Sequence, residues 1–406
     1  MAVTEKYVDP AGGNDYIGAT FTDGVYTDST KNLLKTNAFT ASKAGHYLYL
    51  TGTGITSGYY KIATRTDASN VVLATDAGAD ATDVVCTQAT GTALLPFHTV
   101  QGALDLITRN ATDGDRINVV AGTADTLNAA LSYTTYGTPT AAAQLAIQGC
   151  TSSAGDGGIA EIDGAAGNFT ICTAWTYVTF ADMKLGNTGT ADVLDFSDYS
   201  SAINCEIHTS SGFGVDCGTG SVVLGCWLHD LTGTQAIDSG TGSKILYNYI
   251  DCAVSGSVLD GGTHVAIIGN IIDFSGADTS VDGISAAGTG MIIINNTIFC
   301  GNANTLRGIN AASANIVVLN NVIEGWSGSG GDGIETGDRC FAGANAVYNC
   351  TNPYTLIAAK LNYAIAPNDT VTGSSPFTDA SANDFSIKSS VTGVTEDAYP
   401  SSFRGL

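Results

Sequence analysis

The chain has 406 residues, of which 50 are glycine and 13% are charged, and its formal net charge at pH 7 is −23. An apolar share of 44% is too high for a disordered chain. Its 15 lysine and arginine residues, set against 38 acidic residues, provide no basic surface that could bind nucleic acid. The sequence contains no apolar run of about 18 residues, so no membrane-spanning helix is predicted.

The N-terminal part is expected to hold three elements before the main body begins. Residues 1–20 contain a first strand, residues 21–90 form a small inserted β subdomain, and residues 91–125 hold a capping helix and a first rung. The insertion is predicted from short alternating apolar runs, such as residues 47–50 and 71–73, that are separated by turn-forming segments. It either protects an open sheet edge or serves as a docking module.

A helix is predicted over residues 98–108, where apolar residues form a stripe at helical spacing: Val100, Ala103, Leu104 and Ile107. A stacked structure must cover its first open edge, because unpaired strand edges recruit other chains. We expect this helix to be that cap.

A repeat runs through the central part of the chain. An asparagine, replaced twice by cysteine, stands two places before an aliphatic residue at intervals of 21 to 26 residues, at Cys205, Cys226, Asn248, Asn270, Asn296, Asn321 and Asn345. A second series keeps step with it, at Asp195, Asp216, Asp238, Asp260, Ser285, Asn310 and Glu335, each directly after an aliphatic residue. The spacing fits two or three short strands per turn and no sustained helical pattern, which predicts a parallel β-helix with a stacked asparagine ladder.

Several further segments strengthen this interpretation: YVDP (residues 7–10), GND (13–15), PFHTVQGALD (96–105), GDRINVVAGT (114–123), PF (376–377) and NDFSIK (383–388). With them the chain resembles the right-handed parallel β-helix proteins of the pectate-lyase-like superfamily, except over about residues 21–90. The resemblance implies an all-β fold, with a right-handed parallel β-helix solenoid at residues 126–350, an N-terminal capping helix, the small inserted β subdomain and a closing segment at 351–406. The superfamily contains lyases, hydrolases, phage spikes and inert scaffolds, so the fold does not decide the activity.

The second series forms a predicted column of outward carboxylates, with Asp216, Asp238 and Asp260 as candidate catalytic residues. Neighbouring rungs lie about 5 Å apart and alternate rungs about 10 Å apart. These distances bracket the carboxyl separations of retaining and inverting glycosidases. Crowding of like charges is expected to raise at least one pKa, as a general acid requires. Two alternatives are that the column binds Ca²⁺, the one cofactor considered, and that these are solvated strand ends.

A second outward column follows the asparagine ladder and contains His208, His229, Asp251 and Asp273. Imidazole and carboxylate groups on adjacent rungs could hold a transition metal or supply an acid–base pair, although solvated side chains in such positions are common. Trp227 and Tyr249 occupy one repeat position and form a short aromatic strip that could bind glycan or pack against a subunit.

Lyases of this superfamily use arginine or lysine beside calcium, and residues 171–350 contain only four basic side chains, which disfavours that activity. Cys205 and Cys226 share the ladder position, so buried thiols are expected there, with a disulfide between them as the alternative.

The N-terminal residues 1–6 lack the pattern of a secretory signal, and the thiols suit a reducing compartment. With the resemblance to phage proteins, these features predict a structural protein of the virion, assembled in the host cytoplasm: a bacteriophage spike, fibre or capsid-decoration protein. We expect it to be homotrimeric, to contact a capsid or tail protein, and to bind surface polysaccharide. The alternative is an extracellular polysaccharide hydrolase or lyase acting through the aspartate column.

Overall fold

The computed structural model describes residues 4–89, 91, 96–106, 110–133, 136–164, 168–187, 189–274, 276, 278, 280–356, 370–371, 374–379 and 384–387. Ile107 of the predicted helix stripe and most of the closing segment 351–406 lie outside these residues. The chain divides into two compact units, one made of residues 1–163 with 178–183 and the other of residues 164–177 with 184–406.

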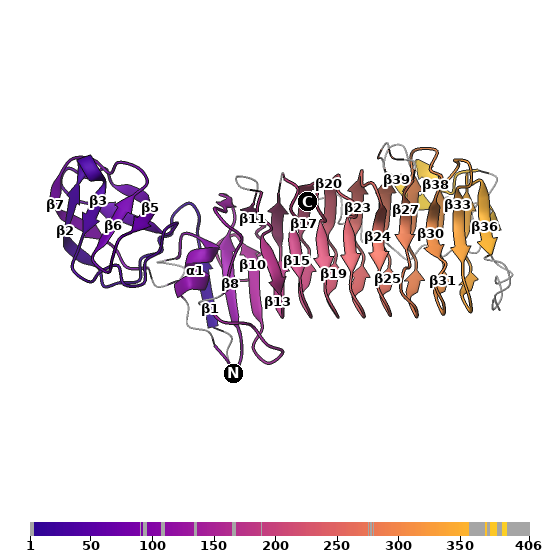
Figure 1. Cartoon of the computed structure of the whole chain (residues 1–406), viewed down its shortest axis with the longest axis horizontal. Coiled ribbons are helices and arrows are strands. Elements are labelled where there is room, and N and C mark those ends of the chain that lie inside the picture. The colour runs from indigo at the N-terminus through magenta and orange to yellow at the C-terminus, as the bar shows by residue number, and fades with distance from the viewer. Residues whose placement is uncertain are drawn as a thin grey trace. The chain divides into compact units, whose positions relative to one another are not determined.

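A closed antiparallel barrel lies within the first unit (Figure 1). Its strands, in sheet order, are β2 (Phe21–Thr27), β3 (Asn32–Leu34), β6 (Asn70–Leu73), β5 (Gly58–Arg65), β4 (Tyr47–Thr51) and β7 (Ala81–Cys86). A short 3-10 turn, η1 (Asp28–Thr30), joins β2 to β3. Alternation places Leu48 and Leu50 in the barrel core while Tyr47 and Tyr49 lie outside. The small inserted β subdomain is confirmed, and it has a hydrophobic core of its own.

The rest of the first unit holds the predicted cap and parallel strands. The helix α1 (Val100–Leu106) buries Val100, Gly102, Ala103 and Leu104 and contacts two of the strands. One parallel sheet contains β1 (Thr4–Val8), β8 (Asp115–Val120), β10 (Leu145–Cys150) and β13 (Val178–Ala181). A second contains β9 (Asp125–Thr126) and β11 (Ala160–Asp163). The N-terminal capping helix is therefore confirmed.

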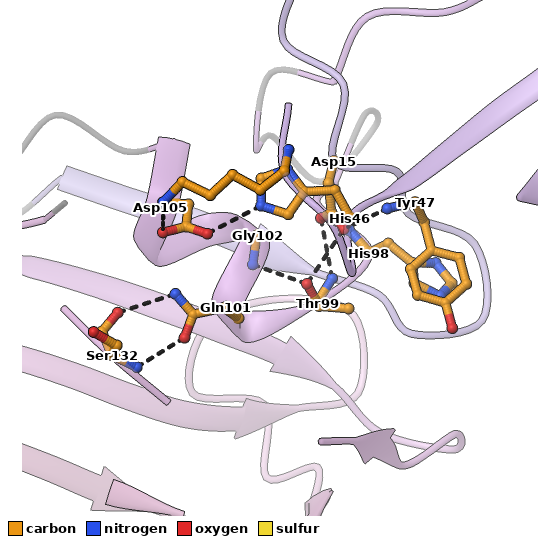
Figure 2. A network of polar contacts seen from close by, with 10 residues as sticks. Asp15, His46, Tyr47, His98, Thr99, Gln101, Gly102, Asp105 and Ser132 are labelled. Carbon is orange, nitrogen blue, oxygen red and sulfur yellow. Dashed lines mark hydrogen bonds and ion pairs between the residues drawn. The ribbon is translucent and has the colours of Figure 1, made fainter. Parts of the chain in front are cut away.

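Buried carboxylates accept hydrogen bonds from the backbone at the start of this helix, and Figure 2 shows those of Asp15. Asp15 accepts hydrogen bonds from the backbone of His98 and Thr99 at 2.9 and 3.2 Å, and from the Tyr47 backbone of the barrel at 3.0 Å. Asp125 accepts from the Val100 backbone at 2.7 Å. These bonds satisfy N–H groups that the first turn of a helix leaves free. Burial raises the pKa of Asp125 to about 7, and the nearby Asp15 charge adds to the shift.

At the other end of the helix, Asp105 receives a hydrogen bond from His46 at 3.0 Å and one from Lys43, both in the barrel segment. Burial alone would raise the pKa of Asp105, but these two hydrogen bonds outweigh it and hold the pKa below its ordinary value. The barrel and the cap helix are thus joined at both helix ends by charged contacts.

The second unit is a stack of parallel rungs in three sheets (Figure 1). Sheet 1 contains β16 (Ser201–Ile203), β19 (Val222–Leu224), β22 (Lys244–Leu246), β25 (Ala266–Ile268), β28 (Ile292–Ile294), β31 (Val317–Leu319) and β34 (Phe341–Gly343). Sheet 2 contains β14 (Met183–Gly186), β17 (Glu206–Ser210), β20 (Trp227–Leu231), β23 (Tyr249–Cys252), β26 (Ile271–Phe274), β29 (Thr297–Cys300), β32 (Val322–Glu324), β35 (Ala346–Tyr348) and β37 (Thr370–Val371).

Sheet 3 contains β12 (Cys172–Trp175), β15 (Leu194–Phe196), β18 (Val215–Cys217), β21 (Ile237–Ser239), β24 (Ser257–Gly261), β27 (Asp282–Ser285), β30 (Arg307–Ala311), β33 (Asp332–Thr336) and β36 (Asn352–Leu356). A separate antiparallel pair is formed by β38 (Phe377–Asp379) and β39 (Asp384–Ile387). The parallel β-helix predicted from the repeat is confirmed.

The asparagine ladder is the internal support of this stack. The side-chain oxygen of Asn296 accepts hydrogen bonds from the backbone and the side-chain amide of Asn270, both at 3.0 Å, and Asn296 donates to Asn321 at 3.0 Å. The same bonds link Asn248 to Asn270 and Asn321 to Asn345. Each ladder residue is buried. The residue before it adopts a left-handed φ, such as 53° at Tyr247 and 69° at Gly269, which turns the chain from sheet 1 into sheet 2.

Candidate functional site

The predicted carboxylate column lies on the outer face of sheet 3. Asp195, Asp216, Asp238 and Asp260 are direct register partners on adjacent strands. The column continues through Ser285, Asn310 and Glu335. Within each strand the neighbours of the aspartate are buried, so the carboxylate faces outward and is half-buried. The three candidate catalytic aspartates are therefore brought together on successive rungs.

The surroundings of this column favour protonated carboxyl groups. Burial, followed by the charges of Asp238, Asp195 and Asp192, raises the pKa of Asp216 to about 6. The pKa values of Asp195 and Asp238 are also raised, again chiefly by burial. Asp260, the next carboxylate of the column, accepts a hydrogen bond from the Gln235 side chain at 2.9 Å. An acid with a pKa near neutral beside an ionised neighbour is the combination that general acid–base catalysis uses.

The far end of the same column is neutralised by a cation that the sequence pattern did not single out. Arg307 forms ion pairs with Glu335 and, at 3.7 Å, with Asp282. Asn310 also donates to Asp282 at 3.0 Å. No ion pair found among the described residues includes one of the four aspartates at the other end. The catalytic prediction therefore applies to the part of the column from Asp195 to Asp260.

The second predicted column lies on the outer face of sheet 2. His208, His229, Asp251 and Asp273 are register partners on β17, β20, β23 and β26. The two imidazole rings stack with centroids 5.5 Å apart. His229 hydrogen-bonds Asp230 at 2.7 Å and Glu206 at 3.3 Å. Burial and then the Asp251 charge raise the pKa of Asp273 to about 6.

Within the described part of the chain, no group of three or more His, Cys, Asp or Glu side chains is placed so that it could hold a metal ion. A metal bound by His208, His229, Asp251 and Asp273 stays a prediction.

The aromatic strip, which we define as Trp227, His229 and Tyr249, lies on the same outer face. Trp227 and Tyr249 are register partners. The indole ring of Trp227 stacks on the His229 imidazole with centroids 4.1 Å apart. Glu206, the register partner of Trp227 on β17, pairs with Lys184 at 3.6 Å. The rings of the aromatic strip provide a flat surface for stacking, and the neighbouring Glu206 and Lys184 provide hydrogen-bonding groups.

The C-terminal β pair covers part of this outer face, which sequence reasoning missed. Phe377 is buried with Val322 and Ala346, and Tyr249, Ile271 and Phe299 pack against this cluster. Ser375 donates a hydrogen bond to Glu324 at 2.6 Å. Tyr249 therefore stands at the border of the covered region, and the strip extends from it toward Trp227. Nothing in the local sequence around Phe377 indicates which sheet it contacts.

The cysteines contribute no crosslink. All ten are free, nine are buried, and Cys350 is half-buried. Cys226 occupies the ladder position, where its thiol lies 3.4 Å from the Ala202 carbonyl oxygen. The alternative of a disulfide between Cys205 and Cys226 is not found. None of the helices in the described segments has the length and apolar character needed to cross a membrane.

Comparisons with known proteins add information on the fold. No family model matches the sequence, and no curated protein matches it. Among solved structures, pectate lyase Pel9A is similar over 77% of this chain and 85% of its own, with a TM-score of 0.50 and 12% identity. A rhamnogalacturonan lyase covers 70% of this chain and 84% of its own, with a TM-score of 0.46 and 11% identity.

The catalytic domain of a GH87 alpha-1,3-glucanase covers 89% of this chain and 90% of its own, with a TM-score of 0.33 and 12% identity. This chain has a pectate-lyase-like parallel β-helix fold. At such identities the similarity concerns the fold alone.

Proposed function

We propose that this protein is a structural β-helix protein of the virion type, a bacteriophage spike, fibre or capsid-decoration protein, that binds polysaccharide along sheet 2. The observation that carries glycan binding is the aromatic strip. Trp227 and Tyr249 face outward on adjacent rungs, and His229 extends the flat surface beside them. Sugar rings present apolar faces that pack on such aromatic surfaces, while Glu206 and Asp251 are positioned to accept hydrogen bonds from hydroxyl groups.

The virion role is supported by the sequence resemblance and by the N-terminal barrel. The barrel has its own core, which includes Leu48, Leu50 and Ile62, so it is a self-contained module suited to attach a solenoid to a particle. We expect the protein to co-purify with assembled particles. Substitutions on the barrel surface should abolish this co-purification.

Glycan binding is tested by measuring retention of the protein on a panel of immobilised bacterial polysaccharides. Trp227→Ala should weaken binding by about two- to twelvefold, since packing of a sugar face on one aromatic ring contributes roughly 0.5 to 1.5 kcal/mol. Tyr247→Ala is the matched control, because Tyr247 is an exposed aromatic residue on a turn and is not in the strip. Equal loss in both variants, or retention by neither the wild type nor the variants, would argue against the strip.

Hydrolysis by the carboxylate column is a second candidate function, and the pKa of Asp216 favours it. In this mechanism Asp216 protonates the leaving oxygen of a glycosidic bond. Asp238 on the next rung, about 5 Å away, would act as nucleophile, whereas Asp260, about 10 Å away, could activate water. Release of reducing ends that disappears in Asp238→Asn, but not in Ser285→Ala, would establish this activity. Repeating the assay with Ca²⁺ and with chelator tests whether the column also holds that cation.

A further inference from the structure

The surface around the aromatic strip is acidic. The outer face of sheet 2 from β14 to β26 carries four carboxylates and one lysine among its described residues: Glu206, Asp230, Asp251, Asp273 and Lys184. Glu206 and Asp251 lie on the strands directly before and after that of Trp227. A ligand that stacks on the strip therefore has negative charge about one rung, or about 4.8 Å, away on both sides.

Lys184 and His229 are already bonded to acids of the same surface. Lys184 pairs with Glu206 at 3.6 Å. The imidazole of His229 has a carboxylate at each nitrogen, Asp230 at 2.7 Å and Glu206 at 3.3 Å. Recognition of a carboxylate, sulfate or phosphate on a sugar requires donors such as arginine or lysine. Lys184 and His229 are used within the protein, whereas the carboxylate oxygens keep further acceptor positions.

The other basic side chains of the stack do not replace them. Residues 171–350 contain three further ones, Lys244, Arg307 and Arg339. Arg307 and Arg339 are paired with carboxylates of neighbouring strands or residues. Lys244 lies on sheet 1. The outer face of sheet 2 thus has no unpaired cation for an anionic polymer among its described residues.

The acids of this surface already repel one another. Asp251 and Asp273 are register partners on adjacent strands. Burial, and then the charge of Asp251, raises the pKa of Asp273 to about 6. An anionic group on a sugar meets the same repulsion, and at about 5 to 7 Å each unit charge lowers affinity by a factor of about three to four in water. Hydroxyl groups are not repelled, and they donate hydrogen bonds to the same carboxylates.

We propose that the polysaccharide bound by the aromatic strip is a neutral one, and that Glu206, Asp230 and Asp251 exclude chains that carry uronate, sulfate or phosphate groups. The inference rests on the proposed glycan binding and makes it specific. Stacking on Trp227 attracts any sugar with an apolar face, so the selection between glycans comes from the charges around it.

The test measures retention of the full-length protein on two sets of immobilised bacterial polysaccharides: neutral dextran, levan and curdlan, and anionic alginate, gellan and xanthan. A chelator is present, so that no divalent cation bridges the acids of the two partners. We expect the wild type to bind at least one neutral polymer and none of the anionic set at about 0.01 M salt, where charges act over about 30 Å.

Chemical conversion of the retained polymer separates charge from sugar identity. Partial carboxymethylation adds carboxylates to the same backbone, and it should weaken binding at least about tenfold at about 0.01 M salt. Methyl esterification of the added groups keeps their bulk and removes their charge, so it should restore binding. Raising the salt to about 1 M, where charges act over only about 3 Å, should also remove most of the difference.

Two matched variants locate the effect. Asp230→Asn removes one charge beside the strip, keeps an oxygen for His229 and suits the φ of 56° at this position. It should raise the affinity for the carboxymethylated polymer, relative to the neutral one, about threefold. Asp198→Asn removes one charge from the segment between β15 and β16 and should leave this ratio unchanged. Because the ratio is measured on one protein, a partial loss of folded protein does not alter it.

Failure of glycan binding and failure of this inference give different results. Retention of no polymer by the wild type would overturn glycan binding and the inference with it. Binding of alginate, gellan or xanthan as tight as that of any neutral polymer would overturn the inference and leave glycan binding intact. So would a methyl ester that binds as weakly as the free carboxylate, or an equal shift of the ratio in both variants.

Discussion

Removal of one ladder asparagine tests how the rungs are held together. The side chain of Asn296 takes part in five hydrogen bonds: it accepts from the backbone and the side chain of Asn270, and donates to Asn321, Ile267 and Ile294. Asn296→Ala deletes all five while the surrounding rungs stay in place. The side chains of Asn270 and Asn321 keep other partners, the Ile245 carbonyl and the Asn296 backbone. The backbone N–H of Asn270 loses the acceptor that the ladder gives it.

The expected cost follows from this count. One buried N–H left unsatisfied costs about 1 to 3 kcal/mol, and each hydrogen bond lost without such a penalty costs about 0.5 to 1.5 kcal/mol. Some of these losses overlap, so we expect Asn296→Ala to lower the free energy of unfolding by about 3 to 5 kcal/mol. Asn296→Cys should cost less, because Cys226 fills the same position in the native ladder.

Urea denaturation of the purified variants measures this difference, with the slope of the transition showing whether cooperativity is preserved. Hydrogen exchange at the Asn270 amide gives the local effect, which matters because stacked repeats can open one rung at a time. Asn204→Gly is the control, since Asn204 is an exposed turn residue with φ 51°, a conformation that suits glycine. A loss below about 1 kcal/mol for Asn296→Ala would refute the reasoning that the ladder stabilises the stack.

Three further outcomes follow from the ionisable groups. Asp125 has a pKa of about 7 in the folded protein and about 4 in the unfolded chain. The free energy of unfolding should therefore fall by up to about 4 kcal/mol as pH rises from 4 to 7. Asp125→Asn keeps an acceptor for the Val100 N–H, and it should remove this pH dependence when unfolding by urea is measured at several pH values. If Asp216 is a general acid, reducing-end release should decline as pH rises through about 6, and a profile without this limb would exclude that role. A thiol reagent should modify at most Cys350 in the native protein and all ten cysteines in denaturant; rapid reaction of several thiols without denaturant would contradict their burial.

The sequence predicted most of what depends on the repeat. Once the Asn248, Asn270 and Asn296 series was aligned, it gave the rung spacing, the buried ladder and the register of the aspartate column, because each rung adds nearly the same number of residues. The cap helix followed from a local apolar stripe. These features were predictable because each is determined by residues within one period of the chain.

The sequence repeat did not predict contacts between distant segments. Asp15 bonds to His98 across 83 residues, and Phe377 packs on Val322, without any periodic signal. The half-exposed apolar side chains on the outer face of sheet 1 were missed for another reason. Strands such as β28, Ile292–Ile294, read as uniformly buried, and only the turn geometry decides that Ile293 faces inward while its two neighbours face outward. Whether the outward carboxylates catalyse, bind cations or are merely solvated depends on a substrate, which no pattern in one chain specifies.

The asparagine ladder also makes the length of the molecule adjustable. Each ladder residue bonds within its own rung and to the rungs directly before and after it, and Asn248 and Asn270 occupy the same ladder position 22 residues apart. Excision of residues 248–269 would therefore join Tyr247 to Asn270 with the left-handed turn preserved, since φ is 53° at Tyr247 and 69° at Gly269. The product would be a shorter solenoid by one step of about 4.8 Å, with intact ends. The length of the solenoid can thus be changed by whole rungs without redesigning its core.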